Sequence, residues 1–263
     1  MILDELAQTA AKRVAEDKKN ISLDEMKQKA YALPKGDFRF EKVLSHRSGR
    51  VICEVKKASP SKGIISQDFP YLDIAAEYEK IGADCISCLT EPSRFLGSDK
   101  IFTDIRHRVN IPMLRKDFTV DEYQIYQSKV MGADAVLLIC SILNSEQLKE
   151  YIGICDTLGI SALVEAHNQD EIKTAVKAGA RIIGVNNRNL KDFSIDLENA
   201  VSLRRMIPRN LIFIAESGIA SPEDAAKMLN YGANAVLVGE AFMKSDDKSG
   251  FLKRIRDLTY DDD

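Results

Sequence analysis

Short apolar runs alternate with longer amphipathic segments from residue 51 onward. In the longer segments apolar residues recur every three or four positions, which is typical of a helix with one buried face. The apolar runs have the length of strands, and eight of them cover residues 51–55, 85–89, 112–115, 135–139, 161–165, 182–186, 211–215 and 235–238. Strands that alternate with helices in this way predict a parallel α/β architecture in which each helix connects two strands.

A Gly-Ala pair precedes every second predicted strand. The pairs begin at Gly82, Gly132, Gly179 and Gly232. Glycine accepts the left-handed conformation that ends a helix before a tight turn, so each period holds two strand–helix units. Four periods predict a closed (β/α)₈ TIM barrel. An open, doubly wound sheet is the alternative, but it favours a glycine-rich phosphate loop after the first strand, and the sequence contains no GxGxxG motif.

The residues before the first strand have a helical pattern. Apolar residues recur at helical spacing over residues 2–14, and Ser22 with Glu25 forms a capping box that begins a second helix. A third, short helix is predicted over residues 40–46. We therefore expect a single barrel domain over residues 1–263, with residues 1–48 as a helical N-terminal extension.

Composition and charge restrict the partners and the location. The formal net charge of −3 provides no general attraction for nucleic acid or anionic membranes. The acidic N-terminal segment is unlike a secretory signal, and no apolar run approaches the ~20 residues of a membrane span. The odd number of cysteines, five, is typical of reduced thiols. We expect a cytoplasmic monomer that binds neither nucleic acid nor membrane.

Cysteine and histidine do not form a metal-binding pattern. Cys85 and Cys88 make a CxxC pair, but within one strand they should point to opposite faces and could not share a metal ion. The three histidines, His46, His107 and His167, lie in no cluster with ligand spacing. We interpret them as surface or capping residues. We expect no metal, no organic cofactor and no acid–base chemistry by histidine.

Charged side chains follow the predicted strands at their carboxyl ends. On the first strand, alternation places Ile52, Glu54 and Lys56 on one face and the residues at 51, 53 and 55 on the other. The polar residues in phase on later strands are Lys116, Glu165, Asn186 with Arg188, and Glu216. Active sites of (β/α)₈ barrels lie at this end of the strands. A structural ion cluster is the alternative, but charges converging from five strands favour catalysis.

Two glycine-containing turns indicate a phosphate site. Ser217-Gly218 follows the seventh predicted strand and Gly239-Glu240 follows the eighth. Such barrels commonly bind phosphate there through backbone N–H groups and a short helix N-terminus. The alternative is that these tight turns need glycine only for their geometry.

Eight motifs fall in order at the predicted strand ends. They are ICEVKKASPSKG at 52–63, LTEPSRFLGS at 89–98, PMLRKDF at 112–118, DEYQIY at 121–126, LVEAHN at 163–168, IGVNNRNL at 183–190, AESGI at 215–219 and LVGEAFM at 237–243. Together they resemble the indole-3-glycerol phosphate synthase family over nearly the whole chain, and the helical extension of that family matches residues 1–48. Asn189, where an Asp is common, and Glu240, where some members carry Ser, depart from the family pattern.

The resemblance implies a carboxy-lyase of tryptophan biosynthesis. Such an enzyme cyclises, decarboxylates and dehydrates the phosphosugar 1-(2-carboxyphenylamino)-1-deoxyribulose 5-phosphate to indole-3-glycerol phosphate. For this chemistry we assign Lys116 as the acid and Glu165 as the base. We expect Lys56 to hold the ring carboxylate, and Glu54 to orient and tune the lysines.

The resemblance also implies how the substrate is held. Asn186, Arg188 and Glu216 would hold the sugar hydroxyls or the anilino group, and Phe95 and Leu96 would flank the aromatic ring. The expected phosphate-binding residues are Ser59, Ser217, Gly218, Gly239 and Glu240.

Three other functions compete with this one. A phosphoribosylanthranilate isomerase would have a Cys base ending the first strand and an Asp acid ending the fourth, whereas this chain has Glu54 with Lys56 and Ile139 with Cys140 there. A lysine Schiff-base aldolase would have its lysine on the sixth strand. A non-catalytic phosphosugar-binding barrel would lack an acid or a base, and both are present.

Overall fold

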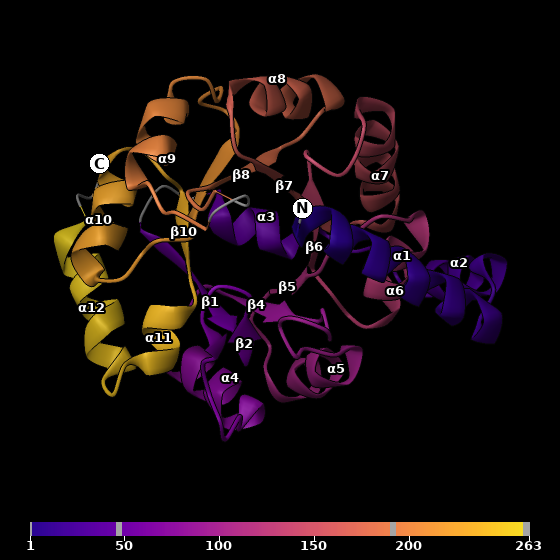
Figure 1. Cartoon of the computed structure of the whole chain (residues 1–263), viewed down its shortest axis with the longest axis horizontal. Helices are drawn as coiled ribbons and strands as arrows, with labels where there is room; N and C mark the ends of the chain where they lie inside the picture. Colours follow the sequence, from indigo (N-terminus) through magenta and orange to yellow (C-terminus); the bar gives the residue numbers. More distant parts are fainter. Residues whose placement is uncertain (1, 46–48, 190–192, 260–263) are drawn as a thin grey trace.

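The computed structural model describes residues 2–45, 49–189 and 193–259, and its eight long strands form a closed barrel (Figure 1). The barrel strands are β1 (Arg50–Val55), β4 (Cys85–Leu89), β5 (Met113–Lys116), β6 (Ala135–Ile139), β7 (Ser161–Ala166), β8 (Ile182–Asn186), β9 (Ile212–Glu216) and β10 (Ala235–Val238). Each pairs in parallel with its neighbours in chain order, and β1 closes the ring by pairing with β10 and β4. The predicted (β/α)₈ barrel is confirmed.

The strand boundaries agree with the apolar runs to within about one residue at each end. Strands β5 and β9 are each shifted by one position toward the C-terminus, so that Lys116 and Glu216 are the last residues of their strands. A short antiparallel pair, β2 (Ala58–Ser59) and β3 (Gly63–Ile64), follows β1 and was not predicted.

Helices surround the barrel and follow each strand. They are α4 (Tyr71–Lys80), α5 (Asp99–Arg108), α6 (Glu122–Val130), α7 (Ser145–Leu158), α8 (Gln169–Ala178), α9 (Leu197–Arg204), α10 (Pro222–Asn230), α11 (Glu240–Lys244) and α12 (Lys248–Leu258). All four glycines of the Gly-Ala pairs have positive φ, between 83° at Gly132 and 94° at Gly232. This confirms the left-handed helix ends predicted from the repeat.

Alternation along the strands divides the core into two shells. Val51, Cys53 and Val55 belong to the outer shell between strands and helices, whereas Ile52 belongs to the inner shell that fills the barrel. Cys85 lies in the inner shell and Cys88 in the outer one, as predicted for the CxxC pair. The inner face of β1 therefore leads from an apolar interior to Glu54 and Lys56 at the carboxyl end.

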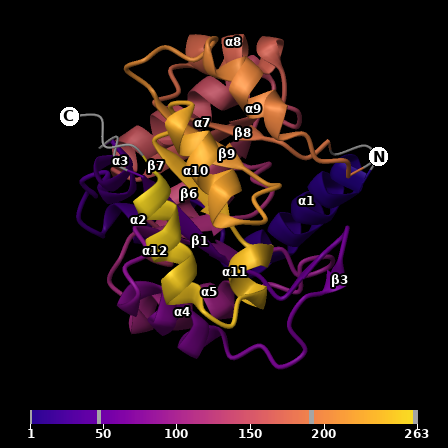
Figure 2. The same ribbon diagram turned by 90° about the vertical axis from the view of Figure 1, so that its left-hand side faces the viewer.

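The N-terminal extension covers both ends of the barrel. It comprises α1 (Ile2–Asn20), α2 (Leu23–Tyr31) and α3 (Arg39–Leu44). The predicted capping box of Ser22 and Glu25 is present, whereas His46 lies outside the described residues. In α3, Phe40 and Leu44 are fully buried against the inner shell and close the amino end. Figure 2 shows α1 with β3 at the opposite end of the barrel from α3.

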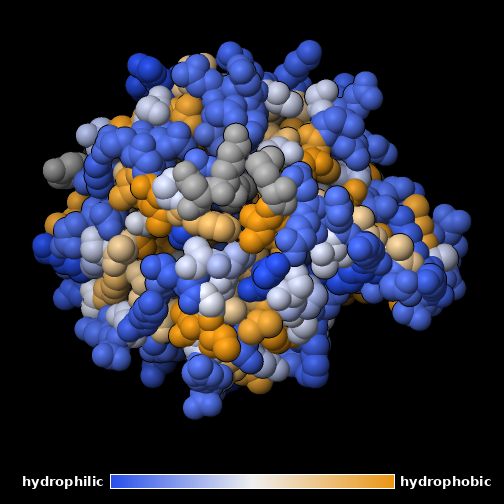
Figure 3. Space-filling model, viewed as in Figure 1, coloured by the Kyte–Doolittle hydropathy of each residue, from blue (hydrophilic) through white to orange (hydrophobic). Residues whose placement is uncertain are grey.

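The face that carries α1 differs from the periphery in polarity. In Figure 3 the surrounding helices are mostly hydrophilic, and apolar patches gather toward the centre of this face. Among the described residues, no helix combines the length and apolar character needed to cross a membrane. The central apolar patches belong to the carboxyl end of the barrel, where the polar strand ends also meet.

Candidate active site

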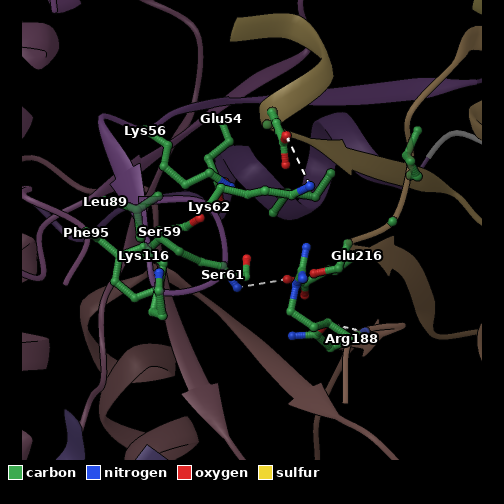
Figure 4. A pocket seen from close by; sticks show the side chains of 18 of the residues that line it. Glu54, Lys56, Ser59, Ser61, Lys62, Leu89, Phe95, Lys116, Arg188 and Glu216 are labelled. Atoms are coloured by element: carbon green, nitrogen blue, oxygen red, sulfur yellow. Dashed lines mark hydrogen bonds and ion pairs between the residues drawn. The ribbon is translucent and has the colours of Figure 1, made fainter. Parts of the chain in front are cut away.

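A cavity of about 650 Å³ opens at the carboxyl ends of the barrel strands. The site residues predicted from the sequence that line it are Glu54, Lys56, Ser59, Phe95, Lys116, Glu165, Asn186, Arg188, Glu216, Ser217, Gly218, Gly239 and Glu240. Figure 4 shows Glu54, Lys56 and Ser59 on one side of the hollow, and Glu216 with Arg188 on the other. The volume is within the usual range for small-molecule sites.

Lys116 lies at the centre of the charged groups. Its Nζ donates to Glu165 Oε2 at 2.9 Å and to Glu216 Oε2 at 2.8 Å. These carboxylates lie at the carboxyl ends of β7 and β9, so the three charges meet across the barrel rather than along one strand. Burial alone lowers the pKa of Lys116, but attraction by Glu165 and Glu216 outweighs it and raises the pKa well above the ordinary value. Lys116 therefore stays protonated at neutral pH.

The two carboxylates beside Lys116 have different proton affinities. Burial raises the pKa of Glu165, but the nearby Lys116 and His167 outweigh it and hold that pKa below its ordinary value. For Glu216, burial dominates over the attraction of Lys116, and repulsion by Glu165 adds to it, so the pKa rises to about 7. Groups in one site whose environments push their pKa values apart are the usual arrangement for acid–base catalysis. Glu165 is ionised and can accept a proton.

Glycine on β8 makes room for Glu216. A Cβ atom at Gly184 would lie 2.0 Å from Glu216 Oε1 and 3.1 Å from a methyl group of Leu163. Glu216 Oε1 is buried and has no hydrogen-bond partner among the described residues. This oxygen therefore lies against the β8 backbone, and no group of the described residues donates to it.

Lys56 forms a second cation site on the opposite side of the cavity. Its Nζ donates to Glu54 Oε1 at 2.6 Å, while Ser87 Oγ lies 3.5 Å from Glu54 Oε2. The Lys56 side chain is 17% exposed, so its ammonium reaches the cavity while Glu54 stays buried beneath it. Glu54 thus holds Lys56 in place and leaves the ammonium accessible to an anion.

Asn186 and Arg188 extend from the end of β8. Asn186 donates from Nδ2 to Glu165 Oε1 at 3.1 Å, and its own Oδ1 accepts from the backbone N–H of Arg188 at 2.9 Å. The Arg188 guanidinium donates to the backbone carbonyl of Phe193 at 3.2 Å. Asn186 therefore holds one oxygen of Glu165 while Lys116 holds the other.

The two glycine turns both line the cavity. Ser217 and Gly218 both have positive φ, 65° and 81°, so this turn brings its backbone to the cavity wall. A Cβ at Gly239 would lie 2.5 Å from Glu54 Oε1 and 2.9 Å from Lys56 Nζ, so a larger residue there would displace these two groups. The Glu240 carboxylate is paired with Lys244 Nζ at 2.8 Å, leaving its backbone N–H as the group suited to an anion.

The apolar part of the cavity is formed by loops and by α1. Phe95 lines the cavity with its ring centroid 6.3 Å from that of Phe118. Ile2, Leu3 and Leu6 of α1 also line the cavity, which the sequence analysis did not predict. Their helical spacing marks an apolar face, but only the folded chain shows which surface that face covers.

Leu96 is the one predicted site residue that does not line the cavity. It is 39% exposed and has a positive φ of 54°. The buried Glu91 holds this loop, because its carboxylate accepts from the backbone N–H groups of Ser93, Arg94 and Phe95. The loop therefore directs Phe95, rather than Leu96, toward the cavity.

A buried network joins α1 to the residue after Lys116. Asp117 accepts from Arg13 of α1 at 2.6 Å and from Thr90 Oγ1 at 2.5 Å. Arg115, which is 2% exposed, donates to Asp99 and to the same Thr90 oxygen. The network fixes α1 over the mouth and holds both neighbours of Lys116.

His167 corrects an expectation from the sequence. It was interpreted as a surface or capping residue, but its ring lies between Glu165 and Glu171, with Nε2 3.4 Å from Glu165 Oε1. The signal that could have identified it is its phase, since it follows Glu165 by two residues as Arg188 follows Asn186. Within the described ranges no group of three or more His, Cys, Asp or Glu side chains is arranged to hold a metal ion.

Comparison with known proteins identifies close sequence relatives. The family model described as "Indole-3-glycerol phosphate synthase" matches residues 3–255. A protein of that name from Ruminiclostridium cellulolyticum is 51% identical over 257 residues, which is 97% of this chain and 99% of the relative. One from Endomicrobium trichonymphae is 50% identical over 258 residues, covering 98% of this chain and 100% of the relative.

Solved structures that resemble the fold are more distant in sequence. The thiamine phosphate pyrophosphorylase from Pyrococcus furiosus has a TM-score of 0.60 and 15% identity, over 82% of this chain and 96% of that one. A 3-hexulose-6-phosphate synthase has a TM-score of 0.62 and 14% identity, over 80% of this chain and 100% of that one. At these identities the likeness supports the barrel fold alone.

Proposed function

The chain belongs to the indole-3-glycerol phosphate synthase family, and from this premise we propose how its residues carry out the reaction. The protein is an enzyme, a carboxy-lyase of tryptophan biosynthesis, and it binds a phosphosugar substrate. The observation that carries the proposal is the placement of Lys116 between two carboxylates of different proton affinity, with Lys56 as a separate cation across the same cavity.

Substrate binding uses the two glycine turns and the second lysine. The phosphate of 1-(2-carboxyphenylamino)-1-deoxyribulose 5-phosphate accepts hydrogen bonds from Ser59 and from the turns at Ser217-Gly218 and Gly239-Glu240. The aromatic ring lies against Phe95, and the ring carboxylate pairs with Lys56. Holding that carboxylate beside the reacting carbon favours ring closure by proximity and keeps CO₂ loss at the same place.

Ring closure joins the carbon that bears the carboxylate to the ketone carbon. The ketone oxygen becomes an alkoxide, and Lys116 donates a proton to it. When the substrate oxygen replaces one carboxylate beside Lys116, part of the attraction that holds the proton is lost, so transfer to the strongly basic alkoxide is favourable. Departure of CO₂ then restores the aromatic ring.

Dehydration needs an acid and a base together. The hydroxyl leaves as water with one proton from an acid, which we assign to reprotonated Lys116, and Glu165 removes the proton that completes the indole. Glu165 can pass that proton back to Lys116 across 2.9 Å. Glu216 and Asn186, which line the cavity, hold the sugar hydroxyls or anilino group, with Arg188 beside them.

Exchange of each lysine for arginine tests the assignment. Arginine cannot give up its proton near neutral pH, so Lys116→Arg should lower kcat by roughly 10²–10⁴ while substrate binding persists. Lys56→Arg keeps a charge for the carboxylate and should act partly on substrate affinity. Steady-state kinetics followed by indole fluorescence measures both, with low background because the chain contains no Trp. If Lys116→Arg keeps more than about a tenth of kcat, Lys116 is not the acid and Lys56 takes that role.

We further propose that the chain works as a single-domain, cytoplasmic monomer. The residues assigned to the site all come from one chain, so no second copy is needed to complete it. All five cysteines are free, which suits a reducing compartment. Sedimentation at working concentration would measure the assembly state, and a mass above that of one chain would contradict the monomer.

A further inference from the structure

His167 lies directly behind the proposed base. Its Nε2 is 3.4 Å from Glu165 Oε1, and its Nδ1 is 3.3 Å from Glu171 Oε2 at the start of α8. Glu171 is itself held by the backbone N–H of His167 at 2.7 Å and by Asn168 Nδ2 at 2.9 Å. The ring therefore connects a buried carboxylate of the site to a carboxylate at the outer end of the barrel.

The two ring nitrogens have different surroundings. Nδ1 faces a carboxylate oxygen of Glu171 at 3.3 Å, which favours the tautomer with the proton on Nδ1. Nε2 is buried and forms no hydrogen bond within the described part of the chain, although it faces Glu165. A buried nitrogen without a partner is costly unless it serves a purpose. Here it is placed to exchange a proton with Glu165 after a small approach of the two groups.

The reaction requires a proton from solvent in each turnover. Ring closure consumes one proton, dehydration consumes one and releases one, and the carboxylate leaves as neutral CO₂. The net uptake of one proton must reach Lys116 and Glu165, which are 14% and 4% exposed, while the substrate fills the mouth. The His167 side chain is 16% exposed and touches Glu165 from the side away from Lys116.

We propose that His167 is a proton-relay residue that couples Glu165 to solvent. The inference rests on the proposed role of Glu165 as the base. In one cycle, the neutral ring, which carries its proton on Nδ1, takes up a second proton from solvent at Nε2 before the substrate closes the mouth. The imidazolium then gives this Nε2 proton to Glu165 Oε1, and Glu165 delivers it to Lys116. The ring returns to the neutral Nδ1–H tautomer, so one proton is transferred inward and the ring is left unchanged.

The surroundings of His167 suit transfer near neutral pH. Burial lowers its pKa, but the hydrogen bond to Glu171 and the charges of Glu165, Glu171 and Glu216 outweigh burial and raise the pKa above 6.5. The cation that opposes them is Lys116, which is bound to Glu165 and Glu216. From α9, Asn199 lies 3.4 Å from the His167 carbonyl and brings no charge.

A purely structural role is the competing explanation, and His167→Gln separates the two. Glutamine can hold Glu171 by a hydrogen bond but cannot carry a proton. We expect kcat to fall about tenfold or more, with KM within about threefold of the parent, and the limb of the kcat–pH profile above pH 6.5 to change. His107→Gln, which alters an exposed histidine on α5, is the matched control and should leave both constants unchanged.

Chemical rescue is the second measurement. In His167→Ala, added imidazole should restore kcat in proportion to its concentration, and substituted imidazoles should follow their pKa values. The relay is refuted if His167→Gln keeps kcat within about twofold of the parent across this pH range. It is also refuted if kcat falls with an unchanged pH profile and without rescue in the folded His167→Ala protein.

A parallel variant distinguishes this inference from the proposed mechanism. Glu165→Gln should be inactive and should not respond to imidazole. If Glu165→Gln is active, the assignment of the base is wrong. If Glu165→Gln is inactive while His167→Gln is fully active, only the relay is wrong.

Discussion

Ionised Glu216 should destabilise the folded chain in a pH-dependent way. Its pKa is raised from 4.5 to about 7, chiefly by burial, with Lys116 opposing and Glu165 adding. A folded state with a raised pKa binds the proton more tightly than the unfolded chain does. The stabilisation of the folded state by this proton is fully present below about pH 4.5 and is lost as the pH rises through 7. At about 1.4 kcal/mol per pH unit, the loss by pH 8 is roughly 3 kcal/mol.

Glu216→Gln removes this titration while keeping the size of the side chain. The amide oxygen can still accept from Lys116, and Gly184 still leaves room for it. Relative to the parent, the variant should therefore gain stability between about pH 5 and pH 8, by roughly 6–10 °C in Tm for a chain of this length. Differential scanning calorimetry of both proteins at the two pH values measures the change. Activity should fall, because the group that contacts the substrate is altered.

Glu165→Gln is the matched variant, and the pH dependence of stability that we expect from Glu165 has the opposite sign. The pKa of Glu165 is held below its ordinary value by Lys116 and His167 despite burial, so its stabilising effect is present above about pH 4.5 and is lost as the pH falls further. Glu165→Gln should therefore destabilise the protein at pH 8. The reasoning about Glu216 is refuted if the Tm difference between Glu216→Gln and the parent is the same at pH 5 and pH 8. It is also refuted if the parent has a higher Tm than Glu216→Gln at pH 8.

Three further predictions concern the rest of the site. Gly218→Asp should weaken the binding of substrate and inorganic phosphate more than Gly218→Ala does. The alanine variant has the same backbone strain and the same contact with Ile195 but adds no charge. If calorimetry gives the two variants equal affinities, the phosphate binds elsewhere. Gly184→Ala should displace Glu216 and lower kcat. Gly153→Ala is the control, because open space surrounds Gly153, and it should leave kcat unchanged. Equal kcat values for the two variants would contradict the close fit of Glu216 against Gly184. Chelation by EDTA should leave turnover unchanged, and a reversible dependence on a divalent ion would show that a metal takes part.

Much of the architecture follows from local patterns in the sequence. The period of two along Val51 to Lys56 determined which side chains face the barrel interior, because successive residues on a strand point to opposite faces. The Gly-Ala repeat identified the helix ends, because few residues other than glycine adopt positive φ at low cost. Since parallel strands end at one edge, the polar residues in phase could be assigned to one mouth before any distance was known.

Only the tertiary structure determined which of these residues meet. Lys116 pairs with Glu165 and Glu216 because barrel closure and strand stagger bring β5, β7 and β9 together, and no local period contains that information. The apolar face of α1 was visible in the sequence, but the surface it covers depends on Arg13 reaching Asp117 across 104 positions. His167 was misread although both carboxylates that it contacts, Glu165 and Glu171, lie within four residues of it, because the burial of Nε2 between them is decided only by the folded barrel. Local periodicity specifies the direction of a side chain, whereas the pKa values and partners in the site arise from groups that are distant in sequence and are brought together by folding.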